Sequence, residues 1–186
     1  MDPLRLYLFA GLIAHKVLWE LLKRNEIGAK QPLPWRVKLV KAIKIGILGA
    51  VLAQTLLPAV VPIAQDPGRL RAAGAFLFTA GLAIAIIARL QLGDNWLDIE
   101  TAAVKRYQRV VSRGIYGYVR HPIYVGDLIL LVGLELAVNS WLVLGAALLI
   151  PVVLRQAVKE EAGLLRSLPG YDIYCRRTKR FIPFVA

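Results

Sequence analysis

Residues 109–124 form the stretch of this chain with the most groups able to do chemistry: Arg-Val-Val-Ser-Arg-Gly-Ile-Tyr-Gly-Tyr-Val-Arg-His-Pro-Ile-Tyr. Pro122 ends any helix that arrives from the N-terminal side and is a natural first-turn residue for a helix that leaves it. The free N–H groups of that next helix, with Arg120 and His121 beside them, form a site suited to a carboxylate or a phosphate. The tyrosine rings of the stretch offer flat faces to an aromatic ligand or a sulfonium cation; they are Tyr116, Tyr118 and Tyr124.

Several motifs in the C-terminal half together resemble the isoprenylcysteine carboxyl methyltransferase family. They are Leu-Gly-Asp-Asn-Trp at 92–96, Gly-Ile-Tyr-Gly-Tyr-Val-Arg-His-Pro-Ile-Tyr at 114–124, Glu-Glu at 160–161 and Arg-Phe-Ile-Pro-Phe at 180–184. The resemblance extends over residues 88–184. It implies an integral-membrane methyltransferase that uses S-adenosylmethionine, with relatives among the phospholipid N-methyltransferases.

The same resemblance implies which residues contact the cofactor. They are Gln108, Val110, Val111, Tyr116, His121, Pro122, Tyr124, Glu160 and Glu161. A carboxylate of the Glu-Glu pair is expected to hold the ammonium of the methionine end or a ribose hydroxyl, and the spacing does not decide which glutamate does so. Judged from the residues alone, the pair could also be a solvated helix face, and His121 could be a loop histidine that caps the next helix.

Two further residues are expected to face the methyl acceptor. By the resemblance, Arg155 lies near the acceptor, where a guanidinium can hold a carboxylate through two hydrogen bonds; otherwise it is an interfacial arginine. Asp127 lies one helical turn beyond Tyr124 and is predicted to contact a polar or cationic acceptor group. An acceptor carboxylate needs no general base, whereas an amine or thiol would need Glu160, its neighbour or His121 to take a proton. The predicted catalytic residues are therefore Arg155 and Glu160.

The composition indicates a membrane protein rather than a soluble domain. Of the 186 residues, 58% are hydrophobic, and the mean hydropathy is positive, which is typical of a chain with membrane spans. The net charge of +12 would fit a nucleic-acid partner, but the cations lie between the apolar runs, so none is expected. The lone Cys175 excludes an internal disulfide and gives no metal site.

The apolar runs predict an all-α protein with about five transmembrane helices. The predicted spans are Leu4–Leu22, Val40–Ile63, Leu70–Leu92, 123–138 and 140–157. The last two are expected to form a tight hairpin at Asn139-Ser140; a single long tilted helix is the alternative. The first run could also be a signal peptide, but Lys23-Arg24 follows it in place of a cleavage site. We expect one domain over residues 1–186, with spans one to three in 1–88 and the catalytic half in 89–186.

The distribution of charge predicts the orientation of these spans. Of the 24 Lys and Arg residues, seven lie in 23–44, six in 89–121 and seven in 155–186. Five spans with the C-terminus in the cytoplasm place all three groups on one side, as the positive-inside rule requires. The segment 89–124 and the C-terminal tail would then build one cofactor pocket at the cytoplasmic face of a prokaryotic cytoplasmic membrane. No GxGxxG follows a strand, so this pocket is not of the Rossmann type.

Three functions remain in competition at this point. The first is carboxyl methylation of an isoprenylcysteine-type or other lipophilic acceptor, and the second is methylation of a phospholipid amine or a lipid thiol. The third is a non-enzymatic membrane protein such as a transporter subunit, which would need polar residues near the middle of several spans. Binding of S-adenosylhomocysteine separates the first two from the third.

Overall fold

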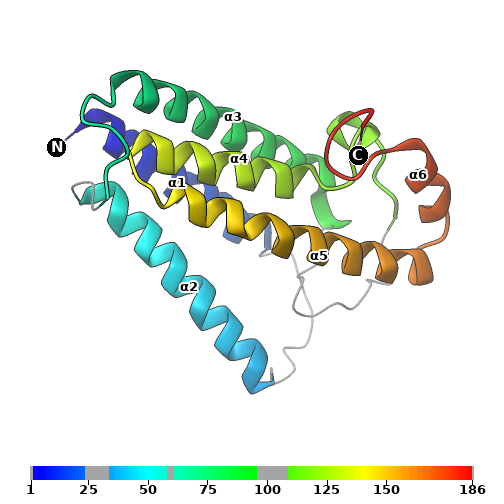
Figure 1. The fold of residues 1–186 in the computed structure, drawn as a ribbon. Helices are drawn as coiled ribbons and strands as arrows, with labels where there is room; N and C mark the ends of the chain where they lie inside the picture. The colour runs from blue at the N-terminus through cyan, green and yellow to red at the C-terminus, as the bar shows by residue number, and fades with distance from the viewer. Residues whose placement is uncertain (1, 24–33, 58–60, 96–108, 186) are drawn as a thin grey trace.

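The computed structural model describes residues 2–23, 34–57, 61–95 and 109–185, and within these ranges every regular element is a helix (Figure 1). The α-helices are α1 (Pro3–Lys23), α2 (Trp35–Leu56), α3 (Gly68–Leu92), α4 (Pro122–Ala137), α5 (Val143–Ser167) and α6 (Tyr171–Arg177). Two short 3₁₀ turns, η1 (Gly93–Asn95) and η2 (Gly114–Gly117), lie between α3 and α4. The all-α prediction is confirmed for the described residues.

Helices α3 and α4 form the centre of the fold, and glycines let them touch backbone to backbone. A Cβ atom added at Gly81 would lie 2.3 Å from the backbone nitrogen of Leu130, and one at Gly133 would lie 2.2 Å from that of Phe78. Gly74 and Gly126 make equally close approaches to the facing helix. Small residues at these four positions therefore set the distance between the two helices.

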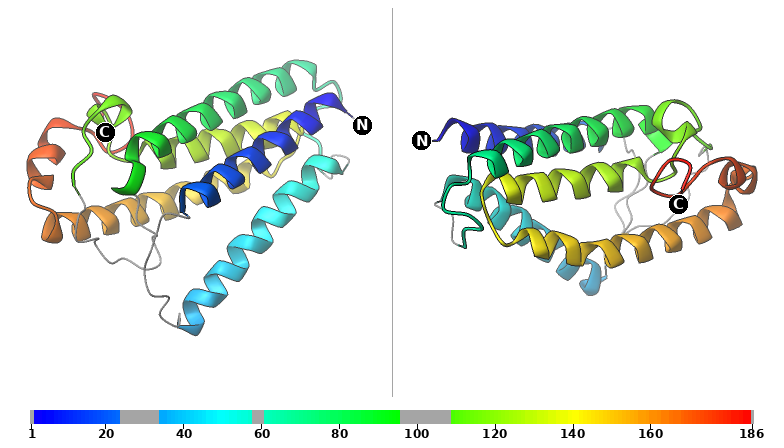
Figure 2. Two further views of the ribbon diagram at one scale, coloured as in Figure 1. Left: turned by 180° about the vertical axis from the view of Figure 1, so that it is seen from behind. Right: turned by 45° about the horizontal axis from the view of Figure 1, so that its top comes forward.

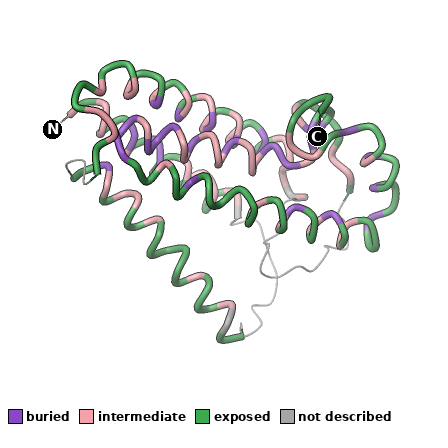
Figure 3. Tube along the Cα trace, in the orientation of Figure 1, coloured by how far each residue is buried: buried purple, intermediate pink, exposed green. Residues whose placement is uncertain are grey.

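Helix α1 covers one side of this pair through an apolar stripe. Leu8 and Leu12 are buried against Phe78, Leu130 and Leu134. The stripe has the i, i+4 spacing of a helix that packs on one face. Helix α2, in contrast, approaches the bundle only at its C-terminal end and diverges along its length (Figure 2), and most of its residues are exposed (Figure 3).

The predicted hairpin between the last two long helices is confirmed. Residues 138–142 reverse the chain between α4 and α5, and Asn139 adopts a positive φ of 61°. Its side chain accepts hydrogen bonds from the backbone N–H groups of Ile63 and Ala64 at 3.2 and 3.0 Å and donates one to the Ala64 carbonyl at 2.8 Å. The alternative of one long tilted helix is wrong. We call this end of the bundle, residues 61–67 and 138–142, the turn end.

The helix bounds agree with most of the predicted spans. Helix α2 begins five residues before the predicted Val40 and ends at Leu56 rather than at Ile63, while α5 runs ten residues beyond 157 to Ser167. By length and composition, two of the described helices could cross a membrane: Val37–Leu56, with a mean hydropathy of 1.6, and Gly68–Leu92, with 2.0.

Candidate functional site

A cavity opens at the end of the bundle opposite the turn end, between residues 109–124 and the second half of α5; we call this the pocket end. The walls of the cavity are partly aromatic, partly aliphatic and partly charged. The lining residues are Leu92, Asn95, Arg109, Val110, Val111, Tyr116, Arg120, His121, Ile123, Tyr124, Glu160, Leu164, Leu168, Tyr171 and Tyr174.

Segment 118–121 and the chain after α6 pair side by side and close one wall of the cavity. The backbone N–H of Arg120 donates to the Lys179 carbonyl at 2.8 Å, and that of Lys179 donates to the Tyr118 carbonyl at 3.0 Å. The Tyr174 hydroxyl donates to the Tyr116 carbonyl at 2.8 Å. We call residues 114–124 the signature segment and the chain after α6, residues 178–185, the tail. The signature segment and the tail therefore share one end of the molecule, as the sequence predicted.

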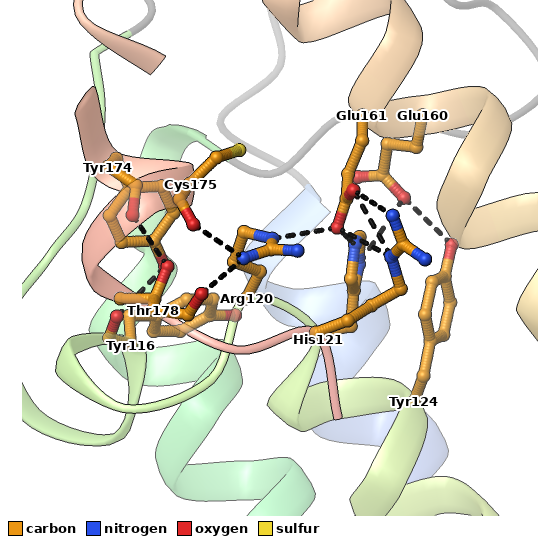
Figure 4. Close-up of polar contacts among 10 residues, drawn as sticks. Tyr116, Arg120, His121, Tyr124, Glu160, Glu161, Tyr174, Cys175 and Thr178 are labelled. Carbon is orange, nitrogen blue, oxygen red and sulfur yellow. Dashed lines mark hydrogen bonds and ion pairs between the residues drawn. The ribbon is translucent and has the colours of Figure 1, made fainter. Parts of the chain in front are cut away.

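Glu161 is the centre of a buried ion cluster that ties these segments to α5 (Figure 4). Its carboxylate accepts hydrogen bonds from Arg120 Nε at 2.8 Å, from His121 Nε2 at 3.0 Å and from Arg180 Nη2 at 2.7 Å. The Glu161 side chain is only 7% exposed. Because all its acceptor sites are directed at these three partners, Glu161 holds the tail, the signature segment and α5 together.

The surroundings of Glu161 keep it ionised. Burial acts to raise the pKa of its carboxyl group, but the hydrogen bonds from His121, Arg180 and Arg120 together outweigh burial and hold this pKa well below the usual 4.5. An ionised carboxylate only accepts hydrogen bonds, so His121 Nε2 carries the proton in its contact with Glu161.

Glu160 has a different environment from its neighbour. It lines the cavity, and its Oε2 atom accepts a hydrogen bond from the Tyr124 hydroxyl at 3.0 Å. His121 Nδ1 lies 4.0 Å from the same oxygen, and the His121 and Tyr124 rings stack with centroids 5.4 Å apart. One oxygen of Glu160 is thus fixed by a hydroxyl while the side chain keeps a 32% exposed fraction. This carboxylate is available to a cationic ligand in the cavity.

The buried tyrosines of the cavity remain neutral. Burial raises the pKa of Tyr116, Tyr171 and Tyr174 above the usual 10. Their phenol rings therefore give uncharged aromatic faces over the physiological pH range, which suits a flat heterocycle or a cation next to a π face.

The structure brings most of the predicted cofactor residues to this cavity. Those that line it are Val110, Val111, Tyr116, His121, Tyr124 and Glu160. Pro122 is buried at the first turn of α4, and Glu161 lies behind the wall in the ion cluster. Gln108 lies outside the described residues.

The two residues predicted to face the acceptor lie away from the cavity lining that the structure describes. Arg155 is exposed on α5, five residues before Glu160. The Asp127 carboxylate is 3.2 Å from His15 Nε2 on α1. Their roles toward an acceptor stay predictions.

Sequence reasoning did not assign several residues that line the cavity. They are Leu92, Asn95, Arg109, Ile123, Leu164, Leu168, Tyr171 and Tyr174. Tyr171 and Tyr174 carried a detectable signal, because two aromatic residues at i, i+3 spacing in a basic tail give one apolar helix face. Leu164 follows Glu160 at i, i+4 spacing on the same face of α5, and Leu168 is the C-cap residue that ends this helix. Within the described ranges no group of His, Cys, Asp and Glu side chains has the arrangement of a metal site.

Comparison with models of known protein families shows to which family the chain belongs. The family model described as phospholipid methyltransferase matches residues 70–168, which contain nearly all of α3, the signature segment, α4 and all of α5. The chain belongs to this family of membrane methyltransferases. The isoprenylcysteine carboxyl methyltransferase resemblance seen in the sequence is confirmed with it.

Two curated relatives are each 30% identical to the chain over the residues that align. The nickel-cobalt-cadmium resistance protein NccN of Alcaligenes xylosoxydans xylosoxydans is 30% identical over 166 residues, which cover 86% of this chain and 72% of that protein. The protein-S-isoprenylcysteine O-methyltransferase of Schizosaccharomyces pombe is 30% identical over 104 residues, 53% of this chain and 43% of the yeast protein. This chain thus matches less than half of the yeast enzyme.

A solved structure has the same fold. It is a eukaryotic intramembrane Ras methyltransferase, an isoprenylcysteine carboxyl methyltransferase, with a TM-score of 0.60 at 18% sequence identity. The superposition covers 100% of this chain and 69% of that one. The helices of this chain therefore have the same arrangement as those of that methyltransferase.

Proposed function

We propose that this protein is an integral-membrane, S-adenosylmethionine-dependent methyltransferase that transfers a methyl group to the carboxylate of a lipophilic acceptor of the isoprenylcysteine type. The observation that carries the proposal is the cavity at the pocket end, where Glu160 and a set of neutral tyrosines meet beside an apolar helix bundle. A methyl donor with a cationic centre and an adenine ring needs a carboxylate such as Glu160 and aromatic faces such as those of the tyrosines.

The groups that line the cavity fit S-adenosylmethionine. Glu160, oriented by Tyr124 at 3.0 Å, would hold the ammonium of the methionine end. The faces of Tyr116 and Tyr171 would contact the sulfonium and the adenine, and Arg109 would pair with the donor's carboxylate. When bound, the donor supplies an electrophilic methyl group.

We propose that five helices, α1 to α5, cross the membrane and that the pocket end faces the cytoplasm of a prokaryotic cell. Three basic segments support this orientation, because 20 of the 24 Lys and Arg residues lie in 23–44, 89–121 and 155–186, the segments that the positive-inside rule assigns to the cytoplasmic side of five spans. Exposed apolar side chains along α5, such as Leu148 at 74% and Val152 at 59%, would then contact lipid.

For a carboxylate acceptor, the chain's own residues have two tasks. Arg155 would orient the acceptor carboxylate, which is ionised at neutral pH and needs no base. The closed wall formed by Arg120, Glu161 and the tail would exclude water and fix the reacting groups, the main contributions available to a reaction of this kind.

Isothermal titration with S-adenosylhomocysteine tests the donor site. The purified protein is expected to bind this ligand, and Glu160→Gln is expected to weaken binding about tenfold or more, because a charge-assisted hydrogen bond is worth about 1.5–3 kcal/mol. Arg166→Gln, an exposed change at the end of α5, is the matched control. Absence of binding by the unmodified protein would refute the proposal.

A methyl-tritiated donor then identifies the acceptor chemistry. A base-labile labelled product formed from a prenylated cysteine analogue indicates the methyl ester that we propose. A base-stable labelled lipid would instead indicate methylation of a phospholipid amine or of a thiol.

A further inference from the structure

His15 and Asp127 are titratable residues inside proposed membrane spans, and the structure brings them together from positions 112 apart in the chain. His15 continues the stripe of α1 that begins with the buried Leu8 and Leu12, and Asp127 continues the α4 stripe of Leu134 and Leu131. Both side chains therefore point between α1 and α4. An ionisable pair at such a place is a candidate functional site, because an ionisable side chain within a membrane span is costly.

Exposure rises along this α1–α4 interface toward the pocket end. The side chains of Leu8 and Leu12 are 0% and 6% exposed, whereas those of His15 and Asp127 are 22% and 44% exposed. Helix α2 covers the interface near the turn end and diverges from it toward the pocket end (Figure 2). The pair consequently lies in an open part of the interface, where a lipophilic molecule can reach it.

The geometry of the pair is that of an imidazole oriented by a carboxylate. Asp127 Oδ1 lies 3.2 Å from His15 Nε2, and Trp19 stacks on the imidazole ring at 4.1 Å with an angle of 26°. A carboxylate on Nε2 places the proton there. Nδ1 then carries a lone pair, and no described residue donates a hydrogen bond to it.

The pair also lies close to the proposed donor site. Asp127 is one helical turn from Tyr124 on α4, and Tyr124 lines the cavity and donates to Glu160. An acceptor that enters from the membrane along the α1–α4 interface would bring its nucleophile between the pair and the cavity.

We propose that His15 and Asp127 form a general-base dyad for a second class of acceptor: a lipophilic molecule whose nucleophile carries a proton, such as a thiol or a phenol. This proposal rests on the proposed methyl transfer. The acceptor's lone pair forms the new bond to the methyl carbon, and the carbon–sulfur bond of the donor breaks with its electron pair going to sulfur. The acceptor's proton goes to His15 Nδ1, and the Asp127 carboxylate stabilises the imidazolium.

The proposal separates acceptors by their need for a base. A carboxylate acceptor reacts as the anion and does not use the dyad, whereas a thiol or phenol is mostly protonated at neutral pH. Removal of a general base lowers turnover by about 10²-fold or more. His15→Asn should therefore reduce kcat for a farnesyl thiol by about that factor and change kcat for a farnesyl thioether carboxylate by less than about threefold.

The experiment measures three quantities in lipid nanodiscs for the unmodified protein, His15→Asn, Asp127→Asn and the control Lys16→Gln, whose side chain is exposed and pairs with Glu20. Titration with S-adenosylhomocysteine should be unchanged in all three variants, which shows an intact donor site. Turnover of the farnesyl thiol should fall in the two dyad variants alone. The ¹⁵N spectrum should show His15 with a protonated Nε2, and Asp127→Asn should shift the tautomer.

The spectrum is readily assigned because the chain has only two histidines. Equal losses on both acceptors, no thiol turnover by a preparation that binds S-adenosylhomocysteine, or a protonated Nδ1 in the neutral His15 ring would each overturn the dyad. Failure of the unmodified protein to bind S-adenosylhomocysteine would instead refute the methyltransferase proposal and the dyad with it.

Discussion

The change Glu161→Gln tests whether one buried carboxylate closes the wall of the cavity. It keeps the size of the side chain but removes the charge that Arg120, His121 and Arg180 all contact at 2.7–3.0 Å. The Glu161 and Arg120 side chains are 7% and 10% exposed, so solvent cannot replace the lost interaction for Arg120.

The expected cost follows from this burial. Breaking a buried ion pair by neutralising one partner costs about 3–5 kcal/mol. Two features place this case at the lower end: Arg180 is 37% exposed, and Arg120 keeps the carbonyl of Cys175 as an acceptor at 3.1 Å. We expect docking of the tail onto the signature segment to weaken by about 3 kcal/mol, which is about two orders of magnitude in the docking equilibrium.

Amide hydrogen exchange measures this loss where it occurs. The N–H groups of Arg120, His121 and Lys179 bond across the joint between segment 118–121 and the tail, so they should exchange about 100-fold faster in Glu161→Gln. Amides of the α3–α4 core, such as that of Leu134, should not change. A rise of less than about threefold at the joint, or an equal rise throughout α3 and α4, would show that the reasoning is wrong. Glu160→Gln is the matched control and should leave the joint intact.

Three further predictions concern pH, the donor site and helix packing. Because the pKa of Glu161 is lower in the folded protein than its usual 4.5, the stabilisation that it gives is complete above that value and is lost as the pH falls below it. The protection of the joint amides, which is their exchange rate relative to the intrinsic rate at the same pH, should be constant from pH 7 to about 5 and fall only at lower pH. Tyr124→Phe removes the hydrogen bond to Glu160 and should weaken S-adenosylhomocysteine binding by about tenfold in calorimetry, with no change in the circular dichroism spectrum. Gly81→Ala places a methyl group 2.3 Å from a backbone nitrogen of α4 and should lower the thermal midpoint by several degrees, whereas Gly145→Ala, with nothing within 4 Å, should not; equal midpoints would contradict the close α3–α4 contact.

The sequence predicted the long helices well where apolar length and breaking residues define them. The predicted span Leu70–Leu92 agrees with α3 (Gly68–Leu92), and 123–138 agrees with α4 because Pro122 begins it. Helix α5 runs past the predicted end at 157 because polar contacts at the pocket end, such as those of Glu161 with Arg120 and Arg180, stabilise its second half. Hydropathy, from which the span was predicted, does not detect polar contacts. The five-span count remains a prediction beyond the two helices that pass by length and composition.

The chemistry of the site was predictable as a region but not residue by residue. The motif at 114–124 and the Glu-Glu pair indicated which segments meet. The separate environments of Glu160 and Glu161 depend on which face of α5 turns toward Arg120 and Arg180, and adjacent residues on a helix point about 100° apart. The contact between His15 and Asp127 was likewise out of reach, because nothing local to either residue specifies a partner 112 positions away.

The close contact between α3 and α4 has a consequence for how ligands enter the cavity. The wall that carries His121 and Tyr124 begins on α4, whose backbone is locked against α3 by glycines, and so it cannot shift without separating the two helices. Glu160 belongs to the opposite wall on α5, which contains Pro151 within the helix and has few buried side chains. We expect one side of the cavity to stay still while α5 bends near the proline to admit and release ligands.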